Sequence, residues 1–431
     1  MPDKNIFCSV PWTNTHIYWD GSFGACCSEN CRPHNDRTKY NLSNMQVIEW
    51  YNSKPMQNVR EQIKSNSALA MCNDCYVEES HGHESRRITE NFKTVIFTEQ
   101  AFDRSYEQSP YYKDFKHNVT ARQPIDWHVD LGNECNLACK MCEPVASSKI
   151  SSLYQKWKLI PVSANSNWTL DEQAWINFKQ SIDAIPNINR IHFMGGEPLL
   201  NKRFPILLDH LINIGRTDIS ISFVTNGTIV NPAIIDRLLK FKTCNVEISI
   251  ESIEHNNHYI RQGSDTDSVL ANIQWLLKQR SDTFSVVLRT VPQLLNVNNY
   301  YKLIRYAYDN GVAIQSIPLV NPAYLQISVL PIELRAKLLP QYYALRDYLN
   351  ERKSTMAAII TGRNVSNIEH MLCRETETII NMLTAPCAGN IEQLRTELIS
   401  WLVRWDREFD MDALNFYPEF ADFLTEYGYK I

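Results

Sequence analysis

Residues 126–142 read DWHVDLGNECNLACKMC, and this stretch decides the fold. Residues 127–131 alternate apolar and polar side chains with the period of two that is typical of a β-strand. The loop directly after this predicted strand carries Cys135, Cys139 and Cys142, with the spacing C-x3-C-x2-C. Three thiols so close together predict an iron–sulfur centre, because a structural zinc site needs a fourth ligand and usually splits its cysteines into two pairs.

Around this stretch, short β-branched runs alternate with amphipathic helices, which is typical of successive βα units. The predicted strands are residues 127–131, 190–194, 219–225, 246–252, 284–290 and 313–319. The predicted helices are residues 170–185 with Thr169 as N-cap, 203–214, 232–239, 268–279 and 299–310. Several strands keep one polar face, whereas parallel strands buried on both faces should be uniformly apolar. The fold class we expect is therefore α/β, a partial (β/α)6 barrel with a polar lumen, and a doubly wound sheet is the alternative.

Four segments follow from the changes in composition along the 431 residues. Residues 1–79 are rich in cysteine and turn residues and predict a small α+β domain. Residues 80–124 are polar and read as a connecting segment. Residues 125–322 carry the βα pattern, and residues 323–431 predict a helical C-terminal extension with strong apolar periodicity at 392–405.

Charge and hydropathy exclude two classes of partner. Lys plus Arg number 43 and Asp plus Glu 48, so the net charge is −5. This lacks the positive excess that usually accompanies binding to nucleic acids or anionic membranes. No apolar run approaches the length of a membrane span, and the polar start at residues 1–5 does not read as a signal peptide. We expect a cytoplasmic protein that binds neither nucleic acid nor membrane.

Cysteine is the unusual count, because nine of the 12 cysteines lie in the first 142 residues. In a reducing compartment a disulfide framework is not expected. Clustered cysteines there read as metal or iron–sulfur ligands, or as catalytic thiols.

With its cysteine loop after the first barrel strand, the sequence resembles the radical S-adenosylmethionine (SAM) superfamily. The resemblance implies that Cys135, Cys139 and Cys142 hold three irons of a [4Fe–4S] cluster and that SAM chelates the fourth. It also implies reductive cleavage of SAM to a 5′-deoxyadenosyl radical, which abstracts a hydrogen from the substrate. Met141 stands where the family usually has an aromatic residue.

Further motifs carry the same resemblance. The run Met194-Gly195-Gly196-Glu197-Pro198 ends the second predicted strand and looks like the GGEP motif that binds the SAM ammonium. Glycines let a backbone approach a ligand closely, and a carboxylate makes charge-assisted hydrogen bonds to an amine. By resemblance the other SAM-binding residues are Asn226, Ser249 and Arg261, with Glu251 in place of a more common Asp and residues 317–319 near the adenine.

A second set of cysteines lies at the N-terminus. Cys8, Cys26, Cys72 and Cys75 have the spacing C-x12-G-x4-C followed by C-x2-C, which resembles twitch or SPASM auxiliary-cluster domains. A hairpin around Asp20-Gly21 and a helix over residues 44–64 fit this reading. A larger SPASM domain has another cysteine where this chain has His81. The resemblance therefore implies the twitch form with one auxiliary [4Fe–4S] cluster, although four cysteines also suit zinc. Such modules usually follow the barrel, whereas this one precedes it.

Some candidates remain open. Cys27 is an alternative to Cys26 as ligand. The residues expected on the polar barrel face are His128, Asp130, His192, Glu247 and Arg289. The residues expected to be structural or solvated bystanders are Cys31, Cys244, Cys373, Cys387, His81 and His83.

These observations predict a radical SAM enzyme, and no catalytic residue is assigned beyond the cofactor ligands. With a fully ligated second cluster, a two-electron oxidation is the expected reaction. A redox-neutral modification, such as epimerisation or carbon–sulfur or carbon–carbon bond formation, is one alternative, and a non-catalytic iron–sulfur or zinc protein is another. The expected partners are a small-molecule or peptide substrate and an external one-electron donor such as a flavodoxin or ferredoxin.

Overall fold

The computed structural model divides the chain into two compact units. The first comprises Met1–Cys135, Leu153–Phe223 and Ala233–Cys244, and the second comprises Asn136–Ser152, Val224–Pro232 and Asn245–Ile431. The structure describes residues 6–27, 36–80, 85–96, 119–161, 167–317, 319–352, 365–387 and 389–431.

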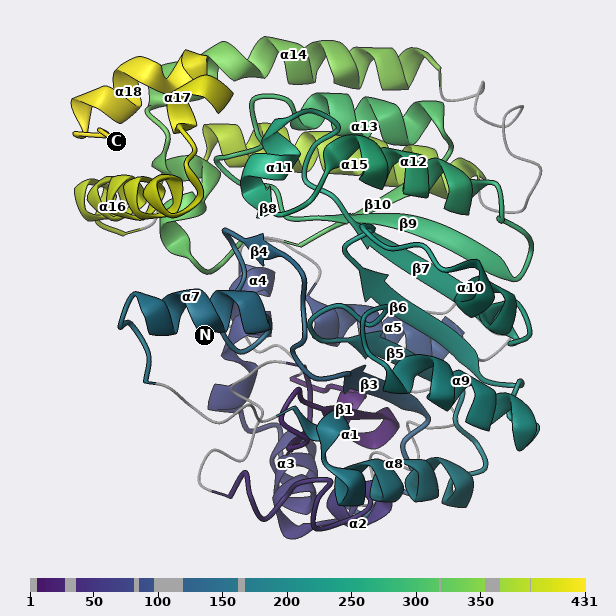
Figure 1. Cartoon of the computed structure of the whole chain (residues 1–431). Helices are drawn as coiled ribbons and strands as arrows, with labels where there is room; N and C mark the ends of the chain where they lie inside the picture. The colour runs from purple at the N-terminus through teal and green to yellow at the C-terminus, as the bar shows by residue number, and fades with distance from the viewer. Residues whose placement is uncertain are drawn as a thin grey trace. The chain divides into compact units, whose positions relative to one another are not determined.

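The first unit is built on a mostly parallel sheet (Figure 1). Its strands, in spatial order, are β6 (Ser220–Thr225), β5 (Arg190–Met194), β3 (Asp126–Asp130), β1 (Asn14–Ile17) and β2 (Phe23–Gly24). The predicted hairpin is confirmed, since β1 and β2 pair antiparallel around Asp20-Gly21. The structure adds that β1 also pairs in parallel with β3. The N-terminal hairpin therefore extends the sheet that carries the first predicted barrel strand.

The two faces of this sheet differ in chemistry. Helices α8 (Glu172–Ala184) and α9 (Arg203–Asn213) cover the apolar face, where Trp127 packs on Phe178 with ring centroids 6.1 Å apart. The opposite face carries His128, as the period-two pattern predicted. There α5 (Arg86–Ile96), within the predicted connecting segment, brings the Arg86 Nη1 to 3.1 Å from the His128 Nδ1. The predicted polar face therefore exists, and α5 supplies one of its charges.

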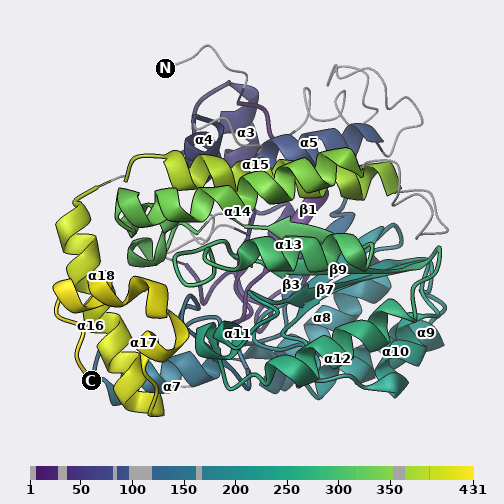
Figure 2. The same ribbon diagram turned by 90° about the horizontal axis from the view of Figure 1, so that it is seen from above.

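In the second unit, the larger sheet has the order β10 (Ala313–Ser316), β9 (Phe284–Thr290) and β7 (Thr243–Ser249). A separate pair joins β4 (Ala138–Cys139) to β8 (Arg261–Gln262). The helices here are α11 (Asn256–Ile260), α12 (Thr266–Leu277), α13 (Tyr300–Asp309), α14 (Ile332–Glu351), α15 (Val365–Thr384), α16 (Ile391–Phe409), α17 (Ala413–Phe416) and α18 (Ala421–Glu426). Figure 2 shows α14 and α15 side by side. The expected α/β fold with parallel strands and a helical C-terminal extension is confirmed.

The remaining helices are α1 (Val10–Thr13), α2 (Val47–Tyr51), α3 (Lys54–Lys64), α4 (Asn73–Ser80), α7 (Ser148–Lys156) and α10 (Pro232–Leu238). The prediction of one helix over residues 44–64 is wrong. Pro55 has no N–H to donate to a carbonyl of the preceding turn, so α2 does not continue through it, and α3 starts afresh at Lys54 with Pro55 in its first turn. The intervening Asn52 bonds instead to the backbone of Ala121, at 3.0 Å through both its amide nitrogen and its carbonyl oxygen.

Two other boundaries differ from the predictions. The N-cap of α8 is Asp171, whose carboxylate accepts from the backbone N–H groups of Gln173 and Ala174, and not Thr169. Strand β7 ends at Ser249, before the predicted residue 252. It ends early because the N–H of Glu251 bonds to the Asn257 side chain at 2.9 Å rather than to a neighbouring strand.

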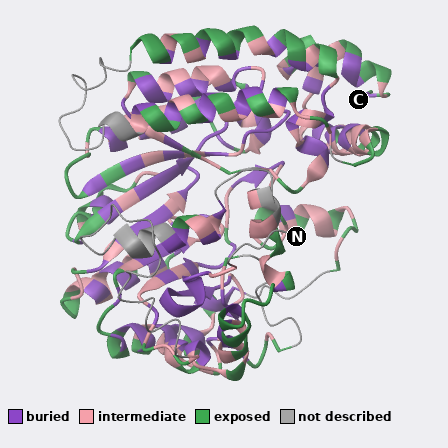
Figure 3. Ribbon diagram, turned by 180° about the vertical axis from the view of Figure 1, so that it is seen from behind, coloured by how far each residue is buried: buried purple, intermediate pink, exposed green. Residues whose placement is uncertain are grey.

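The core of each unit is apolar, and Figure 3 shows buried residues, in purple, along the strands. None of the described helices combines the length and apolar character that crossing a membrane requires.

Candidate functional site

The cysteine loop is held by a short β-ladder in the second unit. Cys139 lies opposite Arg261 in the β4–β8 pair, and the next residue, Lys140, donates its backbone N–H to the carbonyl of Ile260 at 2.9 Å. The N–H of Cys142 bonds to the carbonyl of Cys139 at 3.0 Å. Cys139 is buried and Cys142 half-buried, while Cys135, also half-buried, is the last residue of a segment of the first unit. The backbone around the last two cysteines is therefore held by this ladder and by the turn between Cys139 and Cys142.

Arg261 faces this loop, and its guanidinium is held by the carboxylate of Glu251. Its Nη1 lies 3.8 Å from the Cys139 Sγ, and its Nη2 lies 2.6 Å from the carboxylate of Glu251. Glu251 is completely buried and also accepts from the Thr290 hydroxyl at 3.0 Å and the Val291 N–H at 2.9 Å. The Glu that replaces the expected Asp thus orients a guanidinium toward a cysteine sulfur. Arg261 was predicted as a SAM ligand, and here two of its nitrogens are held by Glu251.

The glycine turn after β5 lies in the first unit, against the chain just before the cysteine loop. Gly196 donates to the carbonyl of Gly132 at 3.1 Å, and Glu197 donates to the carbonyl of Glu134 at 2.7 Å. Gly195 has φ +113°, which disfavours a side chain. A Cβ on Gly196 would lie 2.1 Å from the Glu134 carbonyl oxygen. Both glycines are therefore required by backbone packing, in addition to any approach of a ligand.

Replacing Gly196 by alanine is expected to destabilise the first unit by about 3 kcal/mol, because the backbone contact at 2.1 Å leaves no room for a Cβ. Denaturant unfolding of the cofactor-free protein measures this. Gly215→Ala is the matched control, since its Cβ would meet nothing within 4 Å and only its φ of +74° costs about 1 kcal/mol. Equal unfolding midpoints for the two variants would contradict the packing argument.

The other predicted SAM-binding residues lie at strand ends in the second unit. The Asn226 side chain donates to Asn136 at 2.8 Å, and its carbonyl oxygen accepts from the Thr228 N–H at 3.0 Å. This arrangement links the turn after β6 to the residue that follows Cys135. Ser249 is the last residue of β7 and is buried.

The four N-terminal cysteines gather in the first unit. Cys8 is buried in an apolar cluster with Val10, Trp12, Ile63 and Leu69, and Cys26 and Cys72 pack against this cluster. Burial raises the pKa of the Cys8 thiol well above its ordinary value, and the nearby Cys26, Cys72 and Cys75 thiols raise it further. Such thiols keep their protons until a metal centre replaces those protons. The four cysteines therefore fit a metal centre that binds with release of protons.

Helix α5 holds the segment that carries Cys8, a role that the sequence did not reveal. Asn91 accepts from the Ser9 N–H at 2.7 Å and donates to the Phe7 carbonyl at 2.9 Å, so both neighbours of Cys8 are fixed. Arg87 donates to the same carbonyl and forms an ion pair with Glu79 on α4, the helix that contains Cys75. The polar segment 80–124 gave no signal beyond its charge pattern.

Three of the residues predicted for the polar sheet face, His128, Asp130 and His192, lie in the first unit. His128 lies between His16 and His192, with ring centroids 4.9 and 4.5 Å apart, and His16 Nε2 is 3.3 Å from Asp130. Burial lowers the pKa of His128 well below its ordinary value, as do the neighbouring His192 and Arg86. In the second unit, Glu247 and Arg289 form an ion pair with each other.

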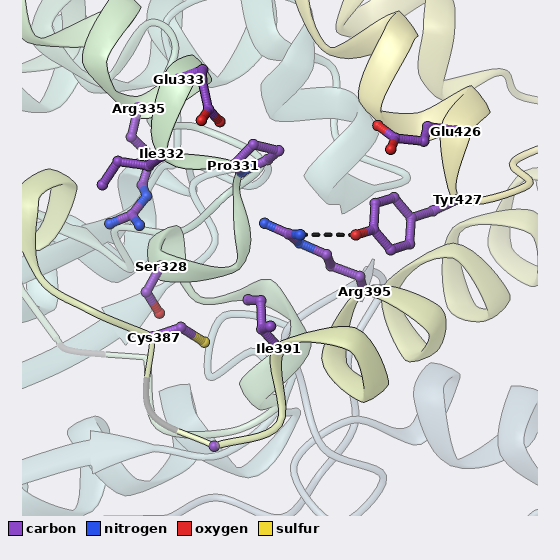
Figure 4. Close-up of a pocket in the computed structure, with 11 residues that line it drawn as sticks. Ser328, Pro331, Ile332, Glu333, Arg335, Cys387, Ile391, Arg395, Glu426 and Tyr427 are labelled. Atoms are coloured by element: carbon purple, nitrogen blue, oxygen red, sulfur yellow. Dashed lines mark hydrogen bonds between the residues drawn. The ribbon is translucent and has the colours of Figure 1, made fainter.

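Of the remaining candidates, three cysteines lie within the described residues. Cys244 is buried, which raises the pKa of its thiol. Cys373 and Cys387 are half-buried. Cys387 lines a cavity of about 450 Å³ at the C-terminal extension, where Arg395 bonds to Tyr427 at 2.8 Å (Figure 4). Cys31, His81, His83 and Pro318 lie outside the described residues.

Comparisons with known proteins identify two domains. Residues 129–307 match the Radical SAM superfamily, and residues 8–76 match SPASM, an iron–sulfur cluster-binding domain. These domains imply a SAM-binding [4Fe–4S] cluster and an auxiliary iron–sulfur cluster.

Curated relatives match only part of the chain. The radical SAM cyclopropyl synthase TigE of Paramaledivibacter caminithermalis is 33% identical over 144 residues, which are 32% of this chain and 29% of that protein. GTP 3′,8-cyclase of Campylobacter jejuni subsp. doylei is 25% identical over 53% of this chain and 67% of its own length. PqqA peptide cyclase of Xanthomonas oryzae pv. oryzae is 23% identical over 41% of each chain. The chain therefore spans less than a third of the first relative.

Proposed function

Because the chain carries a radical SAM domain with a SPASM iron–sulfur domain in front of it, we propose that it cleaves SAM reductively and removes a hydrogen atom from a substrate. The observation that carries this proposal is the ordered loop with Cys139 and Cys142, faced by a guanidinium that a buried carboxylate fixes.

The proposed cluster ligands are Cys135, Cys139 and Cys142. A [4Fe–4S] cluster held there would supply the electron for reductive cleavage of SAM to methionine and the 5′-deoxyadenosyl radical. The chain's own residues bind SAM and orient it. Arg261 stabilises the negative charge on the Cys139 thiolate, because a hydrogen bond from a cation to a thiolate is charge-assisted.

We assign the binding of SAM to the turns after β5 and β6, to Ser249 and to Arg261. Ser249, which is buried at the end of β7, binds the ribose. Gly195, Gly196 and Glu197 bind the SAM ammonium, and Asn226 shapes the turn beside the loop through Asn136. Arg261 binds the SAM carboxylate and also contacts the Cys139 sulfur.

For the reaction class we propose a two-electron oxidation. Cys8, Cys26, Cys72 and Cys75 would supply four ligands to the auxiliary cluster, which leaves no iron open to the substrate and favours electron transfer or a structural role. In the oxidation, the substrate would give one hydrogen atom to the radical, this cluster would be the acceptor for the second electron, and the accompanying proton would go to a base that is not assigned. An external donor such as a flavodoxin or ferredoxin supplies the electron that starts each turnover.

The names of the relatives favour a second candidate. A cyclopropyl synthase, a GTP cyclase and a peptide cyclase all close rings. Bond formation within a peptide or small molecule is therefore the alternative to simple oxidation, and a peptide is the substrate class that the cyclase named for PqqA supports.

The test is reductive cleavage of SAM without added substrate. Anaerobically reconstituted protein is expected to bind about eight irons and eight sulfides per chain, as two [4Fe–4S] clusters require. With dithionite and SAM it should release 5′-deoxyadenosine and methionine, measured by mass spectrometry. Iron-loaded protein that forms no 5′-deoxyadenosine would overturn the proposal. The oxidation is abandoned if a Cys72→Ala protein that has lost the auxiliary cluster still oxidises its substrate fully.

A further inference from the structure

Lys140, between two proposed ligands of the cysteine loop, occupies an unusual position. Its side chain is 4% exposed, and the Nζ makes no hydrogen bond to any residue that the structure describes. The Nζ lies 3.8 Å above the ring of Tyr259 and 5.1 Å from the ring of Trp405. A buried ammonium costs several kcal/mol unless its charge is compensated, and two aromatic faces compensate it in part.

The opposite charge comes from the C-terminal extension. Asp406, on α16 directly after Trp405, is completely buried. One of its carboxylate oxygens, Oδ2, accepts from the Tyr259 hydroxyl at 2.9 Å, the Tyr429 hydroxyl at 2.6 Å and the Ala413 N–H at 3.0 Å. Its Oδ1 is buried and has no hydrogen-bond partner among the described residues. Tyr259 is thus shared, since its ring lies under the Lys140 ammonium and its hydroxyl donates to Asp406.

We infer that the C-terminal extension positions the cluster-binding loop through a buried seat for Lys140, formed by Tyr259, Trp405 and Asp406. This rests on the proposed function, in which that loop binds the cluster. Lys140 and Asp406 are positioning residues. The Lys140 ammonium anchors the loop at the residue that follows the β4–β8 pair, in which Cys139 lies opposite Arg261. The Asp406 carboxylate makes the buried cation tolerable.

Three variants test this seat. Asp406→Asn keeps the shape and removes the negative charge, Lys140→Met keeps the apolar stem and removes the positive charge, and the double variant removes both. Asp410→Asn is the matched control, because it makes the same change at an exposed position next to the end of the same helix, with a left-handed backbone that Asn tolerates.

The first readout is hydrogen exchange of the cofactor-free protein over residues 136–147. Asp406→Asn is expected to speed exchange in this loop at least tenfold, while Asp410→Asn leaves it unchanged. The double variant is expected to recover most of the protection, because no uncompensated charge remains. If Asp406→Asn does not fold, Lys140→Met alone must still speed exchange in the loop relative to the Asp410→Asn control.

The second readout is the electron paramagnetic resonance spectrum of the reduced protein, with and without SAM. Wild-type protein is expected to show a SAM-dependent change that needs at least tenfold more SAM in Asp406→Asn. Wild-type protein without any SAM-dependent change overturns the proposed function. Wild-type behaviour in both single variants, or a double variant no better than Asp406→Asn, overturns the seat alone.

Discussion

Replacing Cys139 by alanine is expected to abolish the formation of 5′-deoxyadenosine and to lower the iron content from about eight to about four per chain. Three cysteine ligands are the minimum for this cluster, and the variant leaves only two. Cys139 is also the sulfur that Arg261 approaches at 3.8 Å, so the charge-assisted contact of the loop is lost with it. Iron and sulfide analysis together with mass spectrometry of the reaction mixture measures both effects.

Two controls separate the clusters. Cys373→Ala changes a half-buried thiol on α15 and is expected to leave iron content and SAM cleavage as in the wild type. Cys72→Ala is expected to lose about four irons and to keep SAM cleavage, because it changes the N-terminal site only. Full SAM cleavage by Cys139→Ala would place the catalytic cluster elsewhere.

Replacing Glu251 by alanine is expected to cost about 3–5 kcal/mol in the free energy of unfolding, because it leaves the Arg261 side chain, which is only 11% exposed, without its counter-charge. The change also removes the acceptor for the Thr290 hydroxyl and the Val291 N–H. Denaturant unfolding of the cofactor-free protein gives the value. Glu251→Gln should be milder, because the amide oxygen still accepts hydrogen bonds.

The matched control is Asp309→Ala, which removes an exposed carboxylate from an ion pair with Arg305 on α13. Exposed pairs of this kind are worth about 0.5 kcal/mol or less. A Glu251→Ala protein as stable as Asp309→Ala would show that Arg261 remains solvated, and the argument that it is fixed against Cys139 would fail.

The secondary structure could be read from local patterns where tertiary contacts agree with them. Strands β5 and β9 have the predicted bounds, because apolar alternation in a strand is a local property. The helix predicted over residues 44–64 and the end of β7 were wrong for opposite reasons. In the first, Pro55 overrides the periodicity locally. In the second, the Asn257 side chain takes a backbone N–H that the pattern assigned to the sheet.

By itself, the sequence determined the cofactor chemistry, because the cysteine spacings and the Gly195–Gly196–Glu197 turn depend on residues only a few positions apart. Only the tertiary structure decided what supports those residues. Asn91 donates a hydrogen bond to Phe7, which lies 84 positions away in the sequence. Asp406 accepts one from Tyr259, which lies 147 positions away. Hydrogen bonds between such distant residues leave no periodic trace in the chain, because they depend on how helices and strands pack once they have formed.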